Sequence, residues 1–407
     1  MLIKIKPGQN SFFLVSLILL ISLPFGFFWS SLSTGLWIAH AVFWYFEHHQ
    51  KGSNNRLILL WLLFCIYLFL SVIWGHNLKL GLSAITNKLY LLIIPLAGLF
   101  LPKISLKTLK KLIHCFSVFL SLTAIVFFLI ALNRWFIYQY DAFLFYHELV
   151  SPLNLNAIYI SYIVSVVWLL NFNLTKSYTG VFVFYQIILA LFLVLLSSKN
   201  ILLITVLALV FQSLFRLKSK LIKTILLLIL SLSFFLVLFT ENPVKDRYLA
   251  EFQTSTEEIF LNTSFDDGRA FTGTEIRLLQ IRAYYNSEKS LKDILFGVGI
   301  GNSQPMIKAF HENLNTPEAY RDYNYHNQYL QILSESGFVG LILFLFFLII
   351  LIKRLSKDFT FLPFVLISIS LFLTESVLYR QRGIIFFSLF MILMLKYESN
   401  ESQLSHR

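Results

Sequence analysis

Long runs of apolar residues recur from one end of the chain to the other, separated by short polar connections. A helix that crosses the hydrocarbon core of a bilayer needs about 20 apolar residues, because it must satisfy all its backbone polar groups internally. The pattern predicts spans at residues 11–28, 30–46, 57–74, 83–101, 109–133, 154–172, 179–197, 200–216, 221–240, 327–352, 359–379 and 383–396. We therefore expect an all-α membrane protein with about 12 transmembrane helices.

Composition supports this expectation. Of the 407 residues, 57% are hydrophobic and 17% aromatic, whereas only 13% are charged. So little charge cannot cover the surface of a large water-soluble protein, and lipid is expected to be the main solvent of the chain.

Lysine and arginine concentrate in alternate connections between the predicted spans. They occur at Lys4 and Lys6, Lys51 and Arg56, Lys103 to Lys111, Lys176, Arg216 to Lys223, and Lys353 to Lys357. Cytoplasmic loops of membrane proteins are enriched in these residues, so these connections and both termini are predicted to be cytoplasmic. We therefore expect most of the basic residues behind the net charge of +12 to fix the membrane topology and to contact anionic lipids, and we do not expect nucleic-acid binding.

The predicted spans divide the chain into four parts. Residues 1–240 contain the first nine spans, 241–325 form one long polar segment, 326–397 contain the last three spans, and 398–407 form a cytoplasmic tail. With an even number of spans, the polar segment of about 85 residues lies on the outer, periplasmic side. It is the candidate for a subdomain built of short helices, because the apolar spacing of 274–282 suits a helix.

Cations on the outer side are informative because membrane topology does not require them there. The outer set consists of Lys199, Arg277, His326, Arg380 and Arg382. This excess of positive charge is expected if a lipid-linked pyrophosphate must be held beside the membrane. The alternatives are that Lys199 reaches for water at the bilayer surface, that His326 is an interfacial anchor, and that the two C-terminal arginines are solvated in a hairpin.

Three further motifs have simpler interpretations. The segment Gly297–Gly301 lacks the preceding strand of a nucleotide-binding loop, so it is interpreted as a tight backbone turn. The pair Asp266–Asp267 is followed at once by glycine and has no partner carboxylate nearby in sequence, which favours a polar turn over a metal site. Cys65 and Cys115 fall inside predicted spans and are expected to be packing residues.

The most specific motif begins the tenth predicted span. It reads His326 to Leu330 (HNQYL) and continues with Glu335, Gly337 and Gly340. A histidine–asparagine pair that opens a span just after a large periplasmic loop resembles the pattern of the O-antigen ligase and O-antigen polymerase superfamily, which are multi-span glycosyltransferases with GT-C-like folds.

Other separated motifs carry the same resemblance. Arg277, followed by the glycine turn at 296–299, is similar to the family's loop arginine, although Ile281 stands where tryptophan is usual. Ser198–Asn200 lies where the family commonly has serine–arginine–glycine, so that lysine replaces the arginine. Looser matches are 23–25, 87–90 with Pro95, 374–376 and 380–383.

The resemblance implies transfer of a glycan from a polyprenyl-diphosphate carrier to an acceptor, which is lipid A core, a protein or another glycan. The reaction would occur on the periplasmic face of a bacterial inner membrane, with no metal and no nucleotide cofactor. His326 is expected to be the general base or an orienting hydrogen-bond donor, and Arg277 to stabilise the charge of the departing diphosphate. Expected diphosphate-binding residues are Lys199, Arg380 and Arg382, and expected supporting residues are Asn327, Glu335 and Glu375.

Within this family we favour a ligase, which joins a finished glycan to its acceptor, over a polymerase, which joins repeat units to one another. A transporter or flippase of lipid-linked sugars would also suit about 12 spans, but no internal repeat is detected and the notable polar residues cluster at one face. A scaffolding protein that makes no bond is the third possibility.

Overall fold

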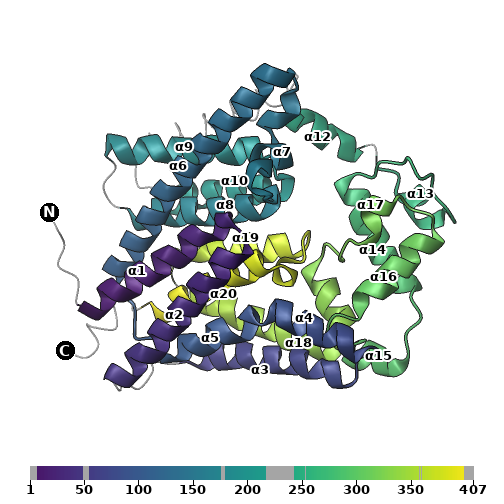
Figure 1. The fold of residues 1–407 in the computed structure, drawn as a ribbon, viewed down its shortest axis with the longest axis horizontal. Coiled ribbons are helices and arrows are strands. Elements are labelled where there is room, and N and C mark those ends of the chain that lie inside the picture. Colours follow the sequence, from purple (N-terminus) through teal and green to yellow (C-terminus); the bar gives the residue numbers. More distant parts are fainter. Residues whose placement is uncertain are drawn as a thin grey trace.

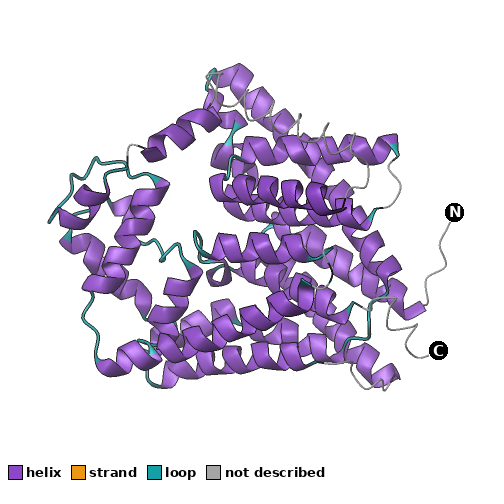
Figure 2. Ribbon diagram, turned by 180° about the vertical axis from the view of Figure 1, so that it is seen from behind, coloured by secondary structure: helices purple, strands orange, loops and turns teal. Residues whose placement is uncertain are grey.

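The computed structural model describes residues 7–48, 55–175, 179–216, 243–252, 254–356, 358 and 360–397. In this part of the chain, helices joined by turns and loops make up the regular structure. An isolated β-bridge between Ile104 and Tyr397 is its only β pairing. The predicted all-α class is therefore confirmed for the described part (Figure 2). The predicted ninth span, 221–240, the cytoplasmic tail and several predicted topogenic basic residues (Lys4, Lys6, Lys51, Lys176, 217–223 and Lys357) lie outside it.

Eleven of the predicted spans fall on helices of the described part. In the first half these are α1 (Pro7–Ser22), α2 (Phe27–His48), α3 (Arg56–Leu70), α4 (Leu78–Lys88), α5 (Tyr90–Phe100), α6 (Leu106–Tyr138), α8 (Ala157–Leu174), α9 (Gly180–Leu196) and α10 (Lys199–Arg216). Near the C-terminus they are α18 (Gln328–Leu355), α19 (Leu362–Phe372) and α20 (Gln381–Lys396). The fourth predicted span is divided between α4 and α5.

Four stretches of the described chain are long and apolar enough to cross a membrane, namely Arg56–Ile73, α6, α8 and α18. A fifth crossing arises if α4 and α5, which meet at an angle of 42°, are counted as one broken span. Other apolar helices are shorter, such as α19 with 11 residues. The apolar helices thus support a membrane protein, whereas the number of twelve crossings stays a prediction.

The polar segment forms a cluster of short helices at one end of the helical bundle (Figure 1). Its helices are α12 (Pro243–Phe252), α13 (Thr256–Leu261), α14 (Gly273–Asn286), α15 (Leu291–Phe296), α16 (Ser303–Asn313) and α17 (Glu318–Arg321). Two small apolar clusters separate from the main core stabilise it, one around Leu279 and the other around Tyr325. We call this segment the loop subdomain.

Helix α14 confirms the helix expected around 274–282, and its start explains its position. Thr272 caps it, and the reciprocal hydrogen bonds between Thr272 and Glu275 form a capping box, which satisfies otherwise unpaired amide groups. Arg282 is not on an exposed helix face. It is buried and donates to the carbonyls of Ile259 and Asn262, both at 2.8 Å, so it holds α13 against α14.

A break in α18 anchors the loop subdomain to the bundle. Gly337 has a positive φ of 67° inside the helix. The carbonyl groups of Ser334 and Glu335, just before the break, accept hydrogen bonds from the amides of Val298 (2.9 Å) and Gly299 (3.1 Å). The segment at 297–301 is therefore a tight backbone turn, as the sequence predicts, and it packs directly on α18.

Close backbone approach requires glycine at this contact. A Cβ atom at Gly297, whose φ is +81°, would lie 2.4 Å from the amide nitrogen of Ser336. We expect Gly297→Ala to cost about 1–3 kcal/mol of stability and to lower the melting temperature of the purified protein by several degrees. Gly268→Ala is the matched control, because a Cβ there would meet nothing within 4 Å; equal melting temperatures for both variants would contradict this packing.

A buried ion pair lies beside the same turn. Lys88, at the end of α4, contacts Glu335 of α18 at 2.5 Å, and both side chains are almost fully buried. Glu335 also accepts hydrogen bonds from the Gly301 amide (3.2 Å) and from Gln331 (2.9 Å). These contacts compensate the buried charge of the Glu335 carboxylate. Through them, Glu335 links α4 and α18 to the glycine turn.

Candidate functional site

A cavity of about 590 Å³ lies where the loop subdomain meets the ends of the bundle helices. Its walls come from α7 (Tyr146–Val150), which contributes Tyr146 and His147, from the starts of α8 and α10, from α12, α14 and α17, and from the turns before α18 and after α19. The bundle thus supplies one part of the lining and the loop subdomain the rest. Such junctions between structural units are common places for ligand sites.

The sequence-predicted site residues meet in this cavity although they are far apart in the chain. Its lining includes Lys199, Arg277, His326, Glu375 and Arg380. Three of these are permanent cations, and they share the space with a histidine and its carboxylate partner. The arrangement concentrates positive charge at one end of the bundle, and a diphosphate carries charge of the opposite sign.

His326 and Glu375 form a hydrogen-bonded pair. The His326 Nδ1 atom lies 3.1 Å from Glu375 Oε2, and the histidine side chain is 23% exposed whereas the glutamate is 3% exposed. A buried carboxylate that accepts from Nδ1–H leaves the other ring nitrogen, Nε2, as a proton acceptor. This is the arrangement of a general base with an orienting carboxylate. Sequence analysis ranked Glu375 only as a supporting residue.

The local backbone places His326 at the cavity edge. Its φ is +46°, a left-handed conformation that is uncommon for residues other than glycine, although histidine, asparagine and aspartate adopt it more often than most. The Asn324 side chain accepts a hydrogen bond from the His326 amide at 2.9 Å, and Asn327 caps α18 by accepting from the Leu330 amide at 3.0 Å. Asn324 and Asn327 therefore hold the turn around His326, and the supporting role of Asn327 in the site stays a prediction.

Arg277 connects the loop subdomain to the end of α19. Its Nε donates to the carbonyl of Thr374 at 3.0 Å, and one terminal nitrogen donates to the carbonyl of Gly273 at 2.8 Å. The two neutral carbonyls fix the direction of the guanidinium group without cancelling its charge. A positioned cation of this kind can stabilise negative charge as it develops on a leaving group.

Lys199 has an acidic partner that sequence analysis missed. Its ammonium group forms an ion pair with Glu251 of α12, while the second oxygen of Glu251 accepts from the Thr274 amide at 3.0 Å. Burial raises the pKa of the Glu251 carboxyl, but hydrogen bonds from Lys199 and Thr274 outweigh this, so its pKa lies below the ordinary value. No motif marks Glu251, because nothing in the sequence shows that α12 folds back over the start of α10.

The turn before Lys199 is as tight as predicted. Ser197 ends α9 in a left-handed conformation with φ of 48°, and α10 begins at Lys199. The next residue, Asn200, donates to the carbonyl of Ser370 and to the hydroxyl of Thr374, both at 2.8 Å. Because Thr374 also accepts from Arg277, one short turn after α19 joins the Lys199 segment to the Arg277 segment.

Three of the expected site residues are not among those that line the cavity: Asn327, which caps α18, Arg382 and Glu335. Arg382 donates from Nε to the carbonyl of Leu23 at 2.8 Å, next to the end of α1, so its described contacts are with the bundle. Glu335 is held by Lys88 and the glycine turn. The position of Glu335 suits a supporting residue that keeps α18 and the loop subdomain together.

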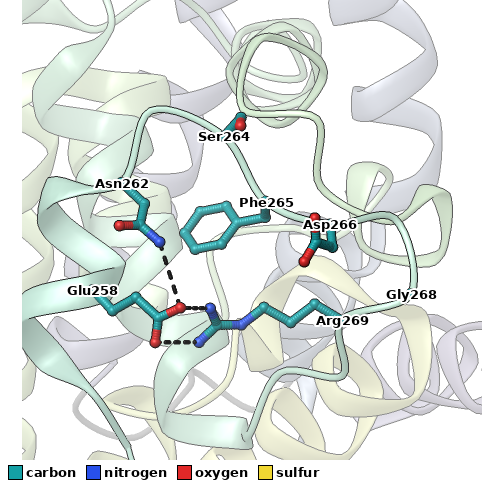
Figure 3. A pocket seen from close by; sticks show the side chains of 7 residues that line it. All are labelled: Glu258, Asn262, Ser264, Phe265, Asp266, Gly268 and Arg269. Carbon is teal, nitrogen blue, oxygen red and sulfur yellow. Dashed lines mark hydrogen bonds and ion pairs between the residues drawn. The ribbon is translucent and has the colours of Figure 1, made fainter.

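A second cavity, of about 550 Å³, lies in the loop subdomain and is lined by residues between Glu258 and Arg269 (Figure 3). The Arg269 guanidinium forms two hydrogen bonds with the Glu258 carboxylate, so the charge of the arginine is neutralised. The Asp266 carbonyl accepts from the Arg269 amide at 3.0 Å, which confirms the predicted polar turn. The residues brought together here form a structural ion pair and lack the base and cation set of the first cavity.

The fold and the first cavity define a helical membrane protein with a cationic, histidine-containing site at one end of the helical bundle. Residues 184–345 match the family model described as O-antigen ligase. The match includes Lys199, Arg277 and His326, and it confirms the resemblance predicted from the sequence. Residues 184–345 are thus similar to the O-antigen ligase and polymerase superfamily of glycosyltransferase-like enzymes. No curated protein matches the chain.

Proposed function

We propose that this protein is an O-antigen ligase-like glycosyltransferase that moves a glycan from a polyprenyl-diphosphate carrier to an acceptor on the periplasmic face of the bacterial inner membrane. The observation that carries the proposal is the meeting of Lys199, Arg277 and Arg380 with the His326–Glu375 pair in one cavity. Diphosphate charge and a hydroxyl to be deprotonated are the two features that such a set complements.

The proposed reaction is a single displacement. An acceptor hydroxyl oxygen attacks the anomeric carbon of the carrier-linked sugar, and its proton passes to Nε2 of His326. The bond between the anomeric carbon and the diphosphate oxygen breaks, and the electron pair leaves with the diphosphate. Arg277 and the neighbouring cations stabilise the charge that develops on that leaving group.

The Lys199–Glu251 pair suits reversible binding of the donor. In the described structure the ammonium charge is balanced by Glu251. A diphosphate, with more charge than one carboxylate, would compete for Lys199, and Lys199 would return to Glu251 when the spent polyprenyl diphosphate leaves. Arg382 is assigned to the support of this site, through the α20 start, and not to direct diphosphate contact.

Surface glycan profiling in a deletion strain tests the proposal. We expect the strain to accumulate normal-length polymer on its carrier, and the native gene but not His326→Ala to restore the attached glycan. Single repeat units on the acceptor would instead indicate the polymerase activity of the same superfamily. A normal profile with His326→Ala would reject catalysis and favour a flippase or a scaffold.

A further inference from the structure

A row of aromatic side chains forms part of the cavity wall and leads to the proposed base. Phe271, Tyr320 and Tyr323 all line the cavity together with His326. Their ring centroids are 5.3 Å apart for Phe271 and Tyr320, 5.6 Å for Tyr320 and Tyr323, and 5.1 Å for Tyr323 and His326. We call Phe271, Tyr320 and Tyr323 the aromatic wall.

The aromatic wall is not simply part of an apolar core. Tyr323 is 37% exposed, and Phe271 and Tyr320 are half-buried. Phe271 packs against the apolar cluster around Leu279, whereas Tyr320 and Tyr323 belong to neither apolar cluster of the loop subdomain. Exposed aromatic faces beside polar groups bind ligands that have both an apolar face and a polar rim.

A pyranose ring has this character, because its C–H bonds form an apolar face and its hydroxyl groups form a polar edge. Local structure holds the aromatic wall in place for such a contact. The Tyr320 hydroxyl accepts from the Phe271 amide at 3.2 Å, and the Tyr323 carbonyl accepts from Gln304 of α16 at 3.1 Å. Little rearrangement would be needed to receive a sugar, which reduces the entropic cost of binding.

We infer that the aromatic wall is the subsite for the acceptor, and that the acceptor presents a sugar ring there. The inference rests on the proposed function. A general base must lie within hydrogen-bond reach of the hydroxyl that it deprotonates, and Tyr323 adjoins His326. A sugar stacked on Tyr323 therefore offers its hydroxyl groups to His326. Of the acceptor classes, this favours a glycan end, as in lipid A core, over a protein side chain.

The test measures acceptor and donor kinetics separately on the purified full-length protein in lipid nanodiscs. The acceptor is lipid A core from the bacterium that encodes the protein, and the donor is the polyprenyl-diphosphate-linked glycan of the same bacterium. We expect Tyr323→Ala to raise the KM for the acceptor about tenfold, with a KM for the donor within twofold of native. Tyr323→Phe keeps the ring and is expected to recover most of the lost acceptor affinity. Tyr285→Ala, which removes a 74% exposed tyrosine of α14, is the control.

A binding measurement separates failure of this inference from failure of the proposed function. Core oligosaccharide released from the host lipopolysaccharide by mild acid is the probe, and saturation-transfer NMR reports its contact with native protein and with Tyr323→Ala. Weaker contact for Tyr323→Ala than for Tyr285→Ala supports the subsite even if native protein transfers no glycan. Equal contact and equal acceptor KM, or a rise in donor KM instead, would overturn it.

Discussion

Replacing His326 with alanine is expected to lower the rate of glycan transfer by about 10²–10⁴-fold, the usual contribution of a positioned general base. Glu375→Gln should have an effect in the same range. Glutamine has nearly the size of glutamate, but a neutral amide does not stabilise the imidazolium that forms when His326 accepts the proton. Its NH₂ group can also donate to Nδ1 and favour the wrong tautomer. The measurement is kcat with saturating donor and acceptor.

Folding must be separated from chemistry in this experiment, because Glu375 is almost fully buried and accepts from the Ser376 amide at 3.2 Å. Glu288→Gln makes the same chemical change at an exposed position of the loop subdomain and should behave as native. The melting temperatures of all variants are compared in detergent. If Glu375→Gln is folded and retains native kcat, the orienting role of the carboxylate is rejected.

Arg277→Ala is expected to lower kcat by about 10²–10³-fold, the effect typical of removing one group that stabilises transition-state charge. Arg277→Lys keeps the charge but loses the planar group that donates to the carbonyls of Thr374 and Gly273. It should therefore recover only part of the rate, since a lysine ammonium group does not reproduce this geometry. Transfer is measured with saturating polyprenyl-diphosphate-linked glycan, so that weaker donor binding does not hide the effect on chemistry.

Lys308→Ala provides the comparison for Arg277, because it removes an exposed cation of the same loop subdomain that pairs with Asp322 at a distance of 3.4 Å. It should leave kcat unchanged. If the positive charge of the loop subdomain only attracted the donor, Arg277→Ala and Lys308→Ala would raise the KM for the donor equally. That result, with kcat unaffected by Arg277→Ala, would contradict a role in stabilising the leaving group.

Much of the fold follows from the sequence because the membrane imposes a simple physical requirement on apolar helices. The hydropathy pattern located α6 and α18, and its predicted span 200–216 begins one residue after the start of α10 at Lys199. It failed to reveal that the fourth span is broken between α4 and α5, although the polar residues Thr86, Asn87 and Lys88 interrupt the run 83–101 just before the bend. It also overestimated the length of α19, because the predicted span 359–379 was carried past the polar residues 374–376 to the apolar residues 377–379, whereas the helix ends at Phe372.

The site was partly predictable for a different reason. Cations that the predicted topology does not require on the outer side, such as Lys199 and Arg277, are conspicuous in a chain with few charges. Both of them line the first cavity. Glu251 was not found, because an acidic residue in a polar loop is ordinary until folding places it against a lysine. The aromatic wall was hidden for a similar reason, since Tyr320 and Tyr323 stand in a segment where tyrosine has no distinctive spacing.

The cavity is built jointly by the loop subdomain and the ends of the bundle helices, and this restricts how acceptor and donor preference could change during evolution or engineering. Arg277 belongs to one unit but is held by the Thr374 carbonyl of the other. Likewise, Glu375 from the hairpin between α19 and α20 orients the histidine at the start of α18. If the loop subdomain of a relative replaced this one, its arginine would lack the matching turn after α19 that holds it. The loop subdomain and the turn after α19 are therefore expected to change together during evolution.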